Sequence, residues 1–299
     1  MICREPKNKS MKEVIIKIIY AFSSSGMGGN PAGVVLNADS LSNEEKQRIA
    51  SKVGLSEIAF VSKSKLADFK LEFFTPTRQI AHCGHATIAT FSYLKQMGFI
   101  KGDRSSKETI DGNRDIYFKN GFAYMEQTSP SYKNVETELS EILESLSLSK
   151  TDLMENHQPS IVNTGNSFLI VPVANKIILK GIHPNMKRIR EYSEKHNLIG
   201  YYIFSLSAEE NVAASTRMFA PRYGIDEEAA TGMAAGPLAC YLIADNFTTE
   251  TELAIKQGEY MSAPSPSLIN VNVILENGKI KKLYAGGEAF VSEERRIEF

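Results

Sequence analysis

Two stretches of this 299-residue chain decide the fold, GHATIATFSYL at residues 84–94 and GMAAGPLACYL at residues 232–242. They match at the first glycine and at a Tyr-Leu pair near the end, and their small residues predict a helix in each. Before each helix stand an aromatic residue and a proline, in Phe-Thr-Pro at residues 74–76 and Phe-Ala-Pro at residues 219–221. A repeat of this kind indicates two copies of one structural unit.

Apolar segments, several of them alternating with polar residues, predict strands on both sides of these helices. The predicted strands are residues 14–20, 32–36, 58–61, 69–74, 107–110, 115–118 and 121–127, then 161–173 with a turn at Gly165, 201–206, 216–219, 253–257, 269–275 and 279–284. Three more helices are expected. One lies between a capping box of Ser42 and Glu45 and a stop at Gly54, one covers residues 135–146, and one covers Pro184–His196 with proline first.

This order of elements predicts an α+β protein of two pseudo-symmetric halves, each a mixed β-sheet wrapped around a central α-helix. The boundary is expected at the Ser-Pro-Ser run of residues 129–131, which gives halves of residues 12–129 and 130–299. A chain of this length favours two domains. We expect the halves to face each other across a cleft, with the final strand free to pack back on the first half.

Composition excludes several classes of protein. Lys+Arg 34 against Asp+Glu 35 gives a net charge of -1, which argues against nucleic acid or anionic lipid as the main partner. No apolar stretch approaches the roughly 20 residues of a membrane span. Residues 1–12 are polar and do not resemble a secretory signal, and residues before Met11 are expected to be an extension outside the fold. Cys3, Cys83 and Cys240 are too few for a disulfide framework, so a cytoplasmic protein is expected.

The starts of the two repeated helices are candidate anion sites. Free backbone N–H groups at Gly84 and Gly232 could hold a carboxylate, although the glycines could equally serve only to cap packed helices. The glycine-rich run of residues 26–29, with Asn30, lacks a phosphate-loop pattern and is expected to be a turn lining the cleft. Histidines at 82 and 85 flank a cysteine, but no second ligand pair accompanies them, so no metal is expected.

Several ordered segments resemble the phenazine-biosynthesis PhzF-like family over nearly the whole chain. They are GGNPAGVVL at residues 28–36, LSEIAFV at 55–61, FTP at 74–76 with CGHAT at 83–87, TG at 164–165, and FAP at 219–221 with ATG at 230–232 and AAGPL at 234–238. The resemblance implies a diaminopimelate epimerase-like fold with the active site between the halves. It also implies a homodimer and an isomerase that moves a proton on a small carboxylated substrate without a cofactor.

The resemblance also implies roles for single residues. Glu57 matches the family's acid/base glutamate, and Gly84 and His85 match its substrate-binding helix start. Glu228 stands where the family has aspartate, and Met233 replaces a serine. At the two positions where other epimerases of this fold carry a pair of cysteines, this chain has Cys83 and Thr231, which disfavours racemisation by two thiols.

The sequence therefore predicts a cofactor-independent isomerase that uses glutamate as general acid and base. A cleft that desolvates Glu57 would raise its pKa toward neutrality. No metal, flavin, nicotinamide or pyridoxal cofactor is expected. The alternative is a small-acid-binding or regulatory protein that keeps the fold without catalysis. The candidate catalytic residues are Glu57, His85 and Glu228, and the candidate substrate-binding residues are Asn30, Gly84, His85, Thr231, Gly232 and Met233.

Overall fold

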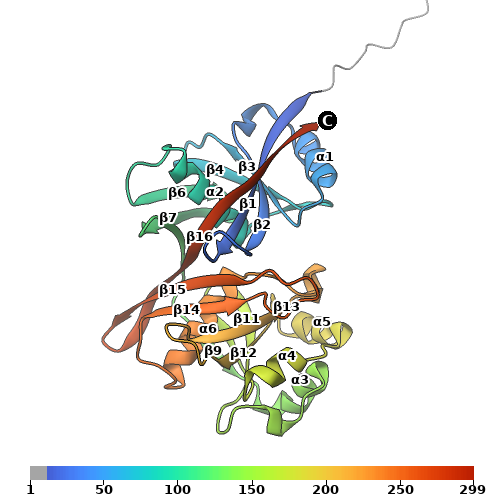
Figure 1. The fold of residues 1–299 in the computed structure, drawn as a ribbon, viewed down its shortest axis with the longest axis vertical. Helices are drawn as coiled ribbons and strands as arrows, with labels where there is room; N and C mark the ends of the chain where they lie inside the picture. The colour runs from blue at the N-terminus through green and yellow to red at the C-terminus, as the bar shows by residue number, and fades with distance from the viewer. Residues whose placement is uncertain (1–11) are drawn as a thin grey trace, which may run out of the picture.

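The two repeated helices, α2 (Gly84–Gln96) and α6 (Gly232–Ala244), each form the centre of one half of the molecule (Figure 1). This is a computed structural model that describes residues 12–299, so the predicted extension, with Cys3, lies outside the described residues. Nearly every side chain of α2 and α6 is buried, as expected for helices without a polar face.

Strands of the first half surround α2. Their hydrogen-bonded order is β1-β2-β3-β4-β6-β7-β8-β16, and the sheet closes because the last strand, β16 (Lys279–Glu298), also pairs with β1. Helix α1 (Asn43–Val53) packs outside this sheet, where Ile49 and Ala50 meet Val35 and Phe60. The strands are β1 (Glu13–Ser23), β2 (Asn30–Val35), β3 (Ile58–Ser62), β4 (Phe69–Phe74), β5 (Gln79–Ile80), β6 (Arg104–Thr109), β7 (Gly112–Lys119) and β8 (Phe122–Gln127).

The second half repeats the plan around α6, in the order β16-β15-β14-β13-β12-β11-β10-β9. Three helices, α3 (Leu139–Leu146), α4 (Lys176–Gly181) and α5 (Met186–Lys195), cover its outer face over a separate apolar cluster. The strands are β9 (Ser131–Asn134), β10 (Ser160–Asn163), β11 (Ser167–Pro172), β12 (Gly200–Leu206), β13 (Ala214–Phe219), β14 (Glu252–Gln257), β15 (Ser267–Glu276) and β16 (Lys279–Glu298). Parallel and antiparallel pairs occur in both halves of the continuous sheet, so the α+β class with mixed strand pairing is confirmed.

Local signals located most elements. The capping box of Ser42 and Glu45 is formed, and Gly54 ends α1 in a left-handed conformation. Two predictions were wrong in detail. Asn185 caps α5, because its side chain accepts a hydrogen bond from the backbone N–H of Arg188, so Pro184 lies before the helix. Helix α3 begins at Leu139 after a short 3-10 turn. The predicted turn at Gly165 is present, and it joins β10 to β11 within residues 161–173.

Strand β16 joins the halves. It was expected to end near Tyr284, but it runs 20 residues to Glu298 and pairs with β15, then β8, then β1. Figure 1 shows it passing from the second half into the first, beside the N-terminal strand. Within residues 12–299, no helix combines the length and apolar character that crossing a membrane requires.

Candidate active site

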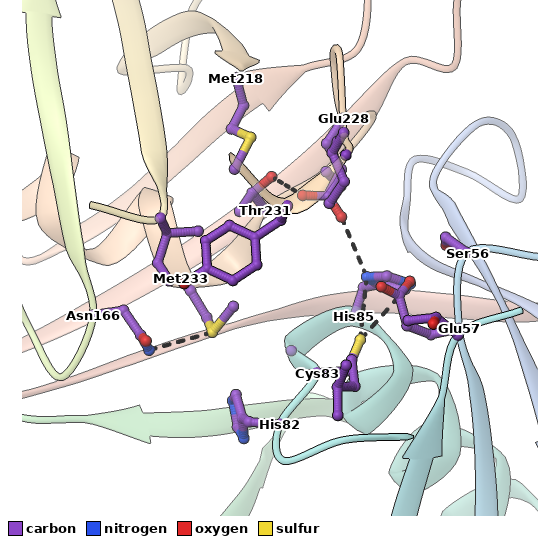
Figure 2. A pocket seen from close by; sticks show the side chains of 18 of the residues that line it. Ser56, Glu57, His82, Cys83, His85, Asn166, Met218, Glu228, Thr231 and Met233 are labelled. Atoms are coloured by element: carbon purple, nitrogen blue, oxygen red, sulfur yellow. Dashed lines mark hydrogen bonds and ion pairs between the residues drawn. The ribbon is translucent and has the colours of Figure 1, made fainter. Parts of the chain in front are cut away.

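A cavity of about 510 Å³ opens between the starts of the two central helices. The first half contributes Glu57 and His85, and the second half contributes Glu228 (Figure 2). Met218 and Ile199 give the second half's wall an apolar character. Further lining residues are Ser56, Thr75, Pro76, Thr77, Arg78, Ile80, His82, Cys83, Gly84, Asn166, Tyr223, Gly224, Ile225, Ala230, Thr231, Gly232 and Met233.

Glu57 immediately precedes β3, at the edge where that strand enters the core. Its carbonyl oxygen accepts a 3.0 Å hydrogen bond from the N–H of Gly33 in the neighbouring β2, which holds the backbone in register. The following Ile58 is fully buried, and Glu57 itself is 8% exposed. The carboxylate is therefore a buried group on a fixed backbone.

His85 lies between two carboxylates from different halves. Its Nε2 is 3.2 Å from Oε2 of Glu57, and its Nδ1 is 3.5 Å from Oε1 of Glu228 (Figure 2). The Sγ atom of Cys83 lies 3.6 Å from the same Nδ1. His85 is 5% exposed, so its ring is shielded from bulk water.

Burial and charge act in opposite directions on this cluster. Burial disfavours the charged form of His85, but contacts with Cys83 and Glu57 outweigh it and raise the His85 pKa well above its usual value. Burial would raise the pKa of Glu57, but the hydrogen bond and charge of His85 bring it below its usual value. The expectation of a raised Glu57 pKa was therefore wrong. Burial raises the pKa of Glu228 and that of the Cys83 thiol.

The loop before α6 holds Glu228. Its Oε1 accepts a 2.9 Å hydrogen bond from the amide of Asn30, and its Oε2 accepts one of 2.9 Å from the hydroxyl of Thr231. Asn30 was expected to bind substrate, but its buried amide also donates to the carbonyl of Ala230, and Asn30 is not among the residues that line the cavity. Gln257 supports the loop through bonds to the backbone of Glu228 and to Thr231.

The start of α6 is packed closely against the first half. A Cβ atom on Gly232 would lie 2.8 Å from Cζ of Phe22, so any larger residue at this position would force Phe22 to shift. Met233 extends toward the start of α2. A Cβ atom added to Gly84 would lie 3.3 Å from Cγ of Met233. Its sulfur accepts a 3.5 Å contact from the amide of Asn166 (Figure 2). Met233 therefore occupies space between the two helix starts.

Three donor atoms of metal-binding type meet in this cluster. Glu57, Cys83 and His85 each offer one atom within 4.8 Å of the others, and all three residues are buried. His82, which the sequence placed beside them, is not part of this group. A cation bound here would use the carboxylate of Glu57 as a ligand. That carboxylate would then not be free to accept a proton. The absence of a functional metal stays a prediction.

Sequence reasoning brought Glu57, His85, Glu228, Thr231 and Met233 to one cavity but missed other residues. Asn166 lies in the turn between β10 and β11, and no local pattern marks it as polar lining. Arg78 reaches the cavity from the loop between β4 and β5. His82 was considered only as a metal ligand, although it lines the cavity.

Comparison with known proteins agrees with this geometry. An uncharacterized isomerase of Clostridium acetobutylicum is 31% identical over 297 residues, which cover 91% of this chain and 94% of the relative. The trans-2,3-dihydro-3-hydroxyanthranilate isomerase of Pseudomonas chlororaphis is 30% identical, over 83% of this chain and 87% of that protein. Among solved structures, a phenazine biosynthesis protein of the PhzF family from Bacillus anthracis superposes with a TM-score of 0.85. It is 30% identical and covers 96% of this chain and 99% of its own.

The family model of phenazine biosynthesis-like proteins matches residues 19–295, from β1 into β16. The match includes both helix starts and every candidate catalytic residue. With this extent of match, the chain belongs to the phenazine biosynthesis-like protein family.

Proposed function

We propose that this chain is a cofactor-independent isomerase in which Glu57 moves a proton between two carbons of a small carboxylate. The row formed by Glu57, His85 and Glu228 carries the proposal, because it joins the two halves at the wall of one cavity. A general base must be ionised and must reach the substrate carbon, and the pairing with His85 favours the ionised form of Glu57 by lowering its pKa. The relatives named above as isomerases support the same reaction class.

The substrate carboxylate would bind between the helix starts. Neither N-cap residue, Cys83 before α2 or Thr231 before α6, uses its side chain to cap its helix. The first-turn N–H groups at Gly84 and Gly232 therefore remain for an anion, and the helix dipoles favour negative charge there. The positive charge of His85 adds to this attraction.

The chemical step balances within the substrate and Glu57. The carboxylate of Glu57 takes a proton from a carbon conjugated with the substrate carboxylate, and the C–H electron pair enters the conjugated system. The substrate carboxylate takes up the charge, which the helix starts stabilise. Protonated Glu57 then returns the proton to a second carbon on the same face, so no atom or electron is gained or lost.

The first substrate to test is trans-2,3-dihydro-3-hydroxyanthranilate, on which the Pseudomonas chlororaphis relative is named to act. It carries a carboxylate on an unsaturated ring, as the proposed step requires. The apolar side of the cavity, with Ile199, Met218 and Ile225, suits a ring of this kind.

Exchange with solvent deuterium tests the role of Glu57. Wild type in deuterated buffer should isomerise the substrate and place deuterium on the receiving carbon, with part of the original proton returned because Glu57 is only 8% exposed. Glu57→Gln keeps the shape of the side chain but cannot act as a base. It should bind carboxylates normally and exchange protons at least ~100-fold more slowly.

Glu155→Gln is the matched control, because Glu155 is exposed and does not line the cavity. It should behave like wild type in both assays. An active Glu57→Gln variant would contradict the assignment of the base. Carboxylate binding by wild type without any proton exchange would favour the alternative of a small-acid-binding protein.

A further inference from the structure

A buried lysine stands behind the wall of the cavity, and the proposed reaction does not use it. Lys107 of β6 is 0% exposed, and within residues 12–299 no carboxylate lies within ion-pair distance of its Nζ. That nitrogen donates a 2.6 Å hydrogen bond to the hydroxyl of Thr87 and lies 3.4 Å from Nδ1 of His82. The ring of Phe73 lies 5.3 Å away on another side.

The two contacts of Lys107 determine how His82 carries its proton. The hydroxyl of Thr87 donates to the carbonyl of Cys83, so it accepts from Lys107. An ammonium group has donors only, so Nδ1 of His82 must accept. Burial and the nearby charges of Lys107 and Arg114 hold the His82 pKa well below its usual value, so the ring is neutral. A neutral ring with an accepting Nδ1 carries its proton on Nε2.

The proton-bearing atom faces the cavity. His82 is one of the lining residues, and its Nδ1 edge is turned toward the fully buried Lys107. Within residues 12–299, Nε2 of His82 makes no hydrogen bond. It is nevertheless not one of the fully buried polar atoms that lack a partner. It is therefore accessible from the cavity, and Figure 2 places His82 below Met233 on the first-half side.

We propose that His82 is a substrate-contacting residue that donates from Nε2 to an oxygen substituent of the substrate, and that Lys107 is the positioning residue that fixes its tautomer. The ligand class is a small carboxylate with a second, hydrogen-bond-accepting oxygen on its body. The identity of the ligand rests on the proposed function, whereas the state of His82 does not. His82 would select among carboxylates and leave the proton transfer at Glu57 unchanged.

Nitrogen NMR tests the tautomer without any ligand. The chain has five histidines, so His82→Gln identifies the His82 signals by their loss. At pH 6, where Lys107 is charged because burial lowers its pKa only to about 7, we expect an unprotonated Nδ1 and a protonated Nε2. Lys107→Met should produce a mixture of tautomers. A protonated Nδ1 in wild type would overturn the assignment.

Binding of benzoate and the three monohydroxybenzoates tests the contact. Wild type should bind at least one hydroxybenzoate more tightly than benzoate, by three- to tenfold. His82→Leu should abolish this preference, because it removes the donor. His82→Gln should retain it, because an amide can place an N–H near the position of Nε2. His183→Gln, at an exposed histidine, is the control and should match wild type.

The outcomes separate this inference from the proposed function. Unchanged selectivity in His82→Leu, together with weakened benzoate binding in His85→Ala, would overturn the role of His82 and leave the proposed site intact. A wild-type protein that binds none of these acids would contradict the proposed substrate class and, with it, the contact from His82. Circular dichroism of each variant shows whether a loss reflects unfolding.

Discussion

At the scale of single residues, His85 lowers the pKa of both carboxylates beside it and burial raises both, but the balance differs between them. His85 lowers the pKa of Glu57, with which it pairs through Nε2, whereas burial dominates at Glu228 and raises its pKa. The pKa of Glu57 therefore lies below its usual value, and that of Glu228 lies above it. This difference makes Glu57 the more readily ionised of the two carboxylates, as the proposed base must be.

The pH dependence of anion binding follows from these shifts. The raised pKa of His85 means that its positive charge is present below that pKa and is lost as pH rises through it. Affinity for benzoate should therefore persist through neutral pH and fall in a limb above the usual histidine range. In Glu57→Gln this limb should move to lower pH, because a carboxylate that raises the His85 pKa is gone. Calorimetric titration across pH 5–10 measures this limb in wild type and in Glu57→Gln. A limb at the same pH in both proteins would contradict the pairing of Glu57 with His85.

Met233 and His85 should affect carboxylate binding in opposite directions. Met233→Ser removes a side chain that lies between the helix starts and adds a hydroxyl donor there, so it should tighten benzoate binding. His85→Ala removes a charged donor and should weaken it. Each change is worth ~1–2 kcal/mol, typical of a hydrogen bond to a charged group. Equal affinities in wild type and both variants would move the carboxylate site elsewhere.

The residues of the site were predictable only where a local motif surrounds them. Glu57 and His85 lie in segments that resemble a family, and the repeat marks Gly232. Asn166 and Lys107 carry no such signal, because their roles come from contacts across the fold. Asn166 contacts the Met233 sulfur. Lys107 contacts His82 and Thr87. The direction of the Glu57 pKa shift was predicted wrongly, because the sequence indicates that Glu57 is buried but does not show that it pairs with His85.

At the scale of elements, the start of α6 depends on a close approach between the halves. Gly232→Ala would place a Cβ atom 2.8 Å from Cζ of Phe22, a residue that is 1% exposed and has little room to move. Overpacking of this kind typically costs about 1–3 kcal/mol. The variant should lose this much free energy of unfolding and also bind benzoate less well.

Gly181→Ala is the control for Gly232→Ala. Gly181 ends α4, and a Cβ atom there meets nothing within 4 Å. Its stability should lie within about 0.5 kcal/mol of wild type, as for most surface changes. Urea unfolding of both variants provides the comparison, and equal stability would contradict the packing argument at Phe22.

Elements with a local signal were predictable, and those stabilised by tertiary contacts were not. Helix α1 has its capping box, and α2 and α6 have their small residues. The end of β16 is rich in charge, so it lacks the alternation of a strand. It is ordered instead by pairing with β1, with ion pairs such as Lys17 to Glu294 across the ladder. Helix α4 is only six residues long and was missed for that reason.

At the scale of the whole molecule, β16 belongs to both halves. It pairs with β15 in the second half and with β8 and β1 in the first, so it closes the sheet around α2. The repeat predicted the two halves and left the final strand free to pack back on the first half, where β16 pairs with β8 and β1. The homodimer implied by family resemblance stays a proposal, which light scattering against the 33.1 kDa monomer would test.

Removing residues 290–299 should open the first half. These residues supply the partners of β1 from Tyr20 back to Glu13, and without them the apolar side chains of Ile16 and Ile18 lie on an unpaired edge. Loss of the ladder hydrogen bonds, at roughly 1 kcal/mol each, is comparable with the whole margin of about 5–15 kcal/mol of a typical fold. The truncated chain should therefore be unfolded or aggregated under conditions in which wild type is native.

A peptide of residues 288–299, present while the truncated chain is refolded, should pair with β1 as the sheet forms and restore benzoate binding. Lys17→Ala in the intact chain is the control. It removes one ion pair at the surface and should cost less than about 1 kcal/mol, which separates the contribution of the ladder from that of its charges. Urea unfolding measures all three proteins. A truncated chain with the wild-type midpoint would show that the first half holds its sheet without β16.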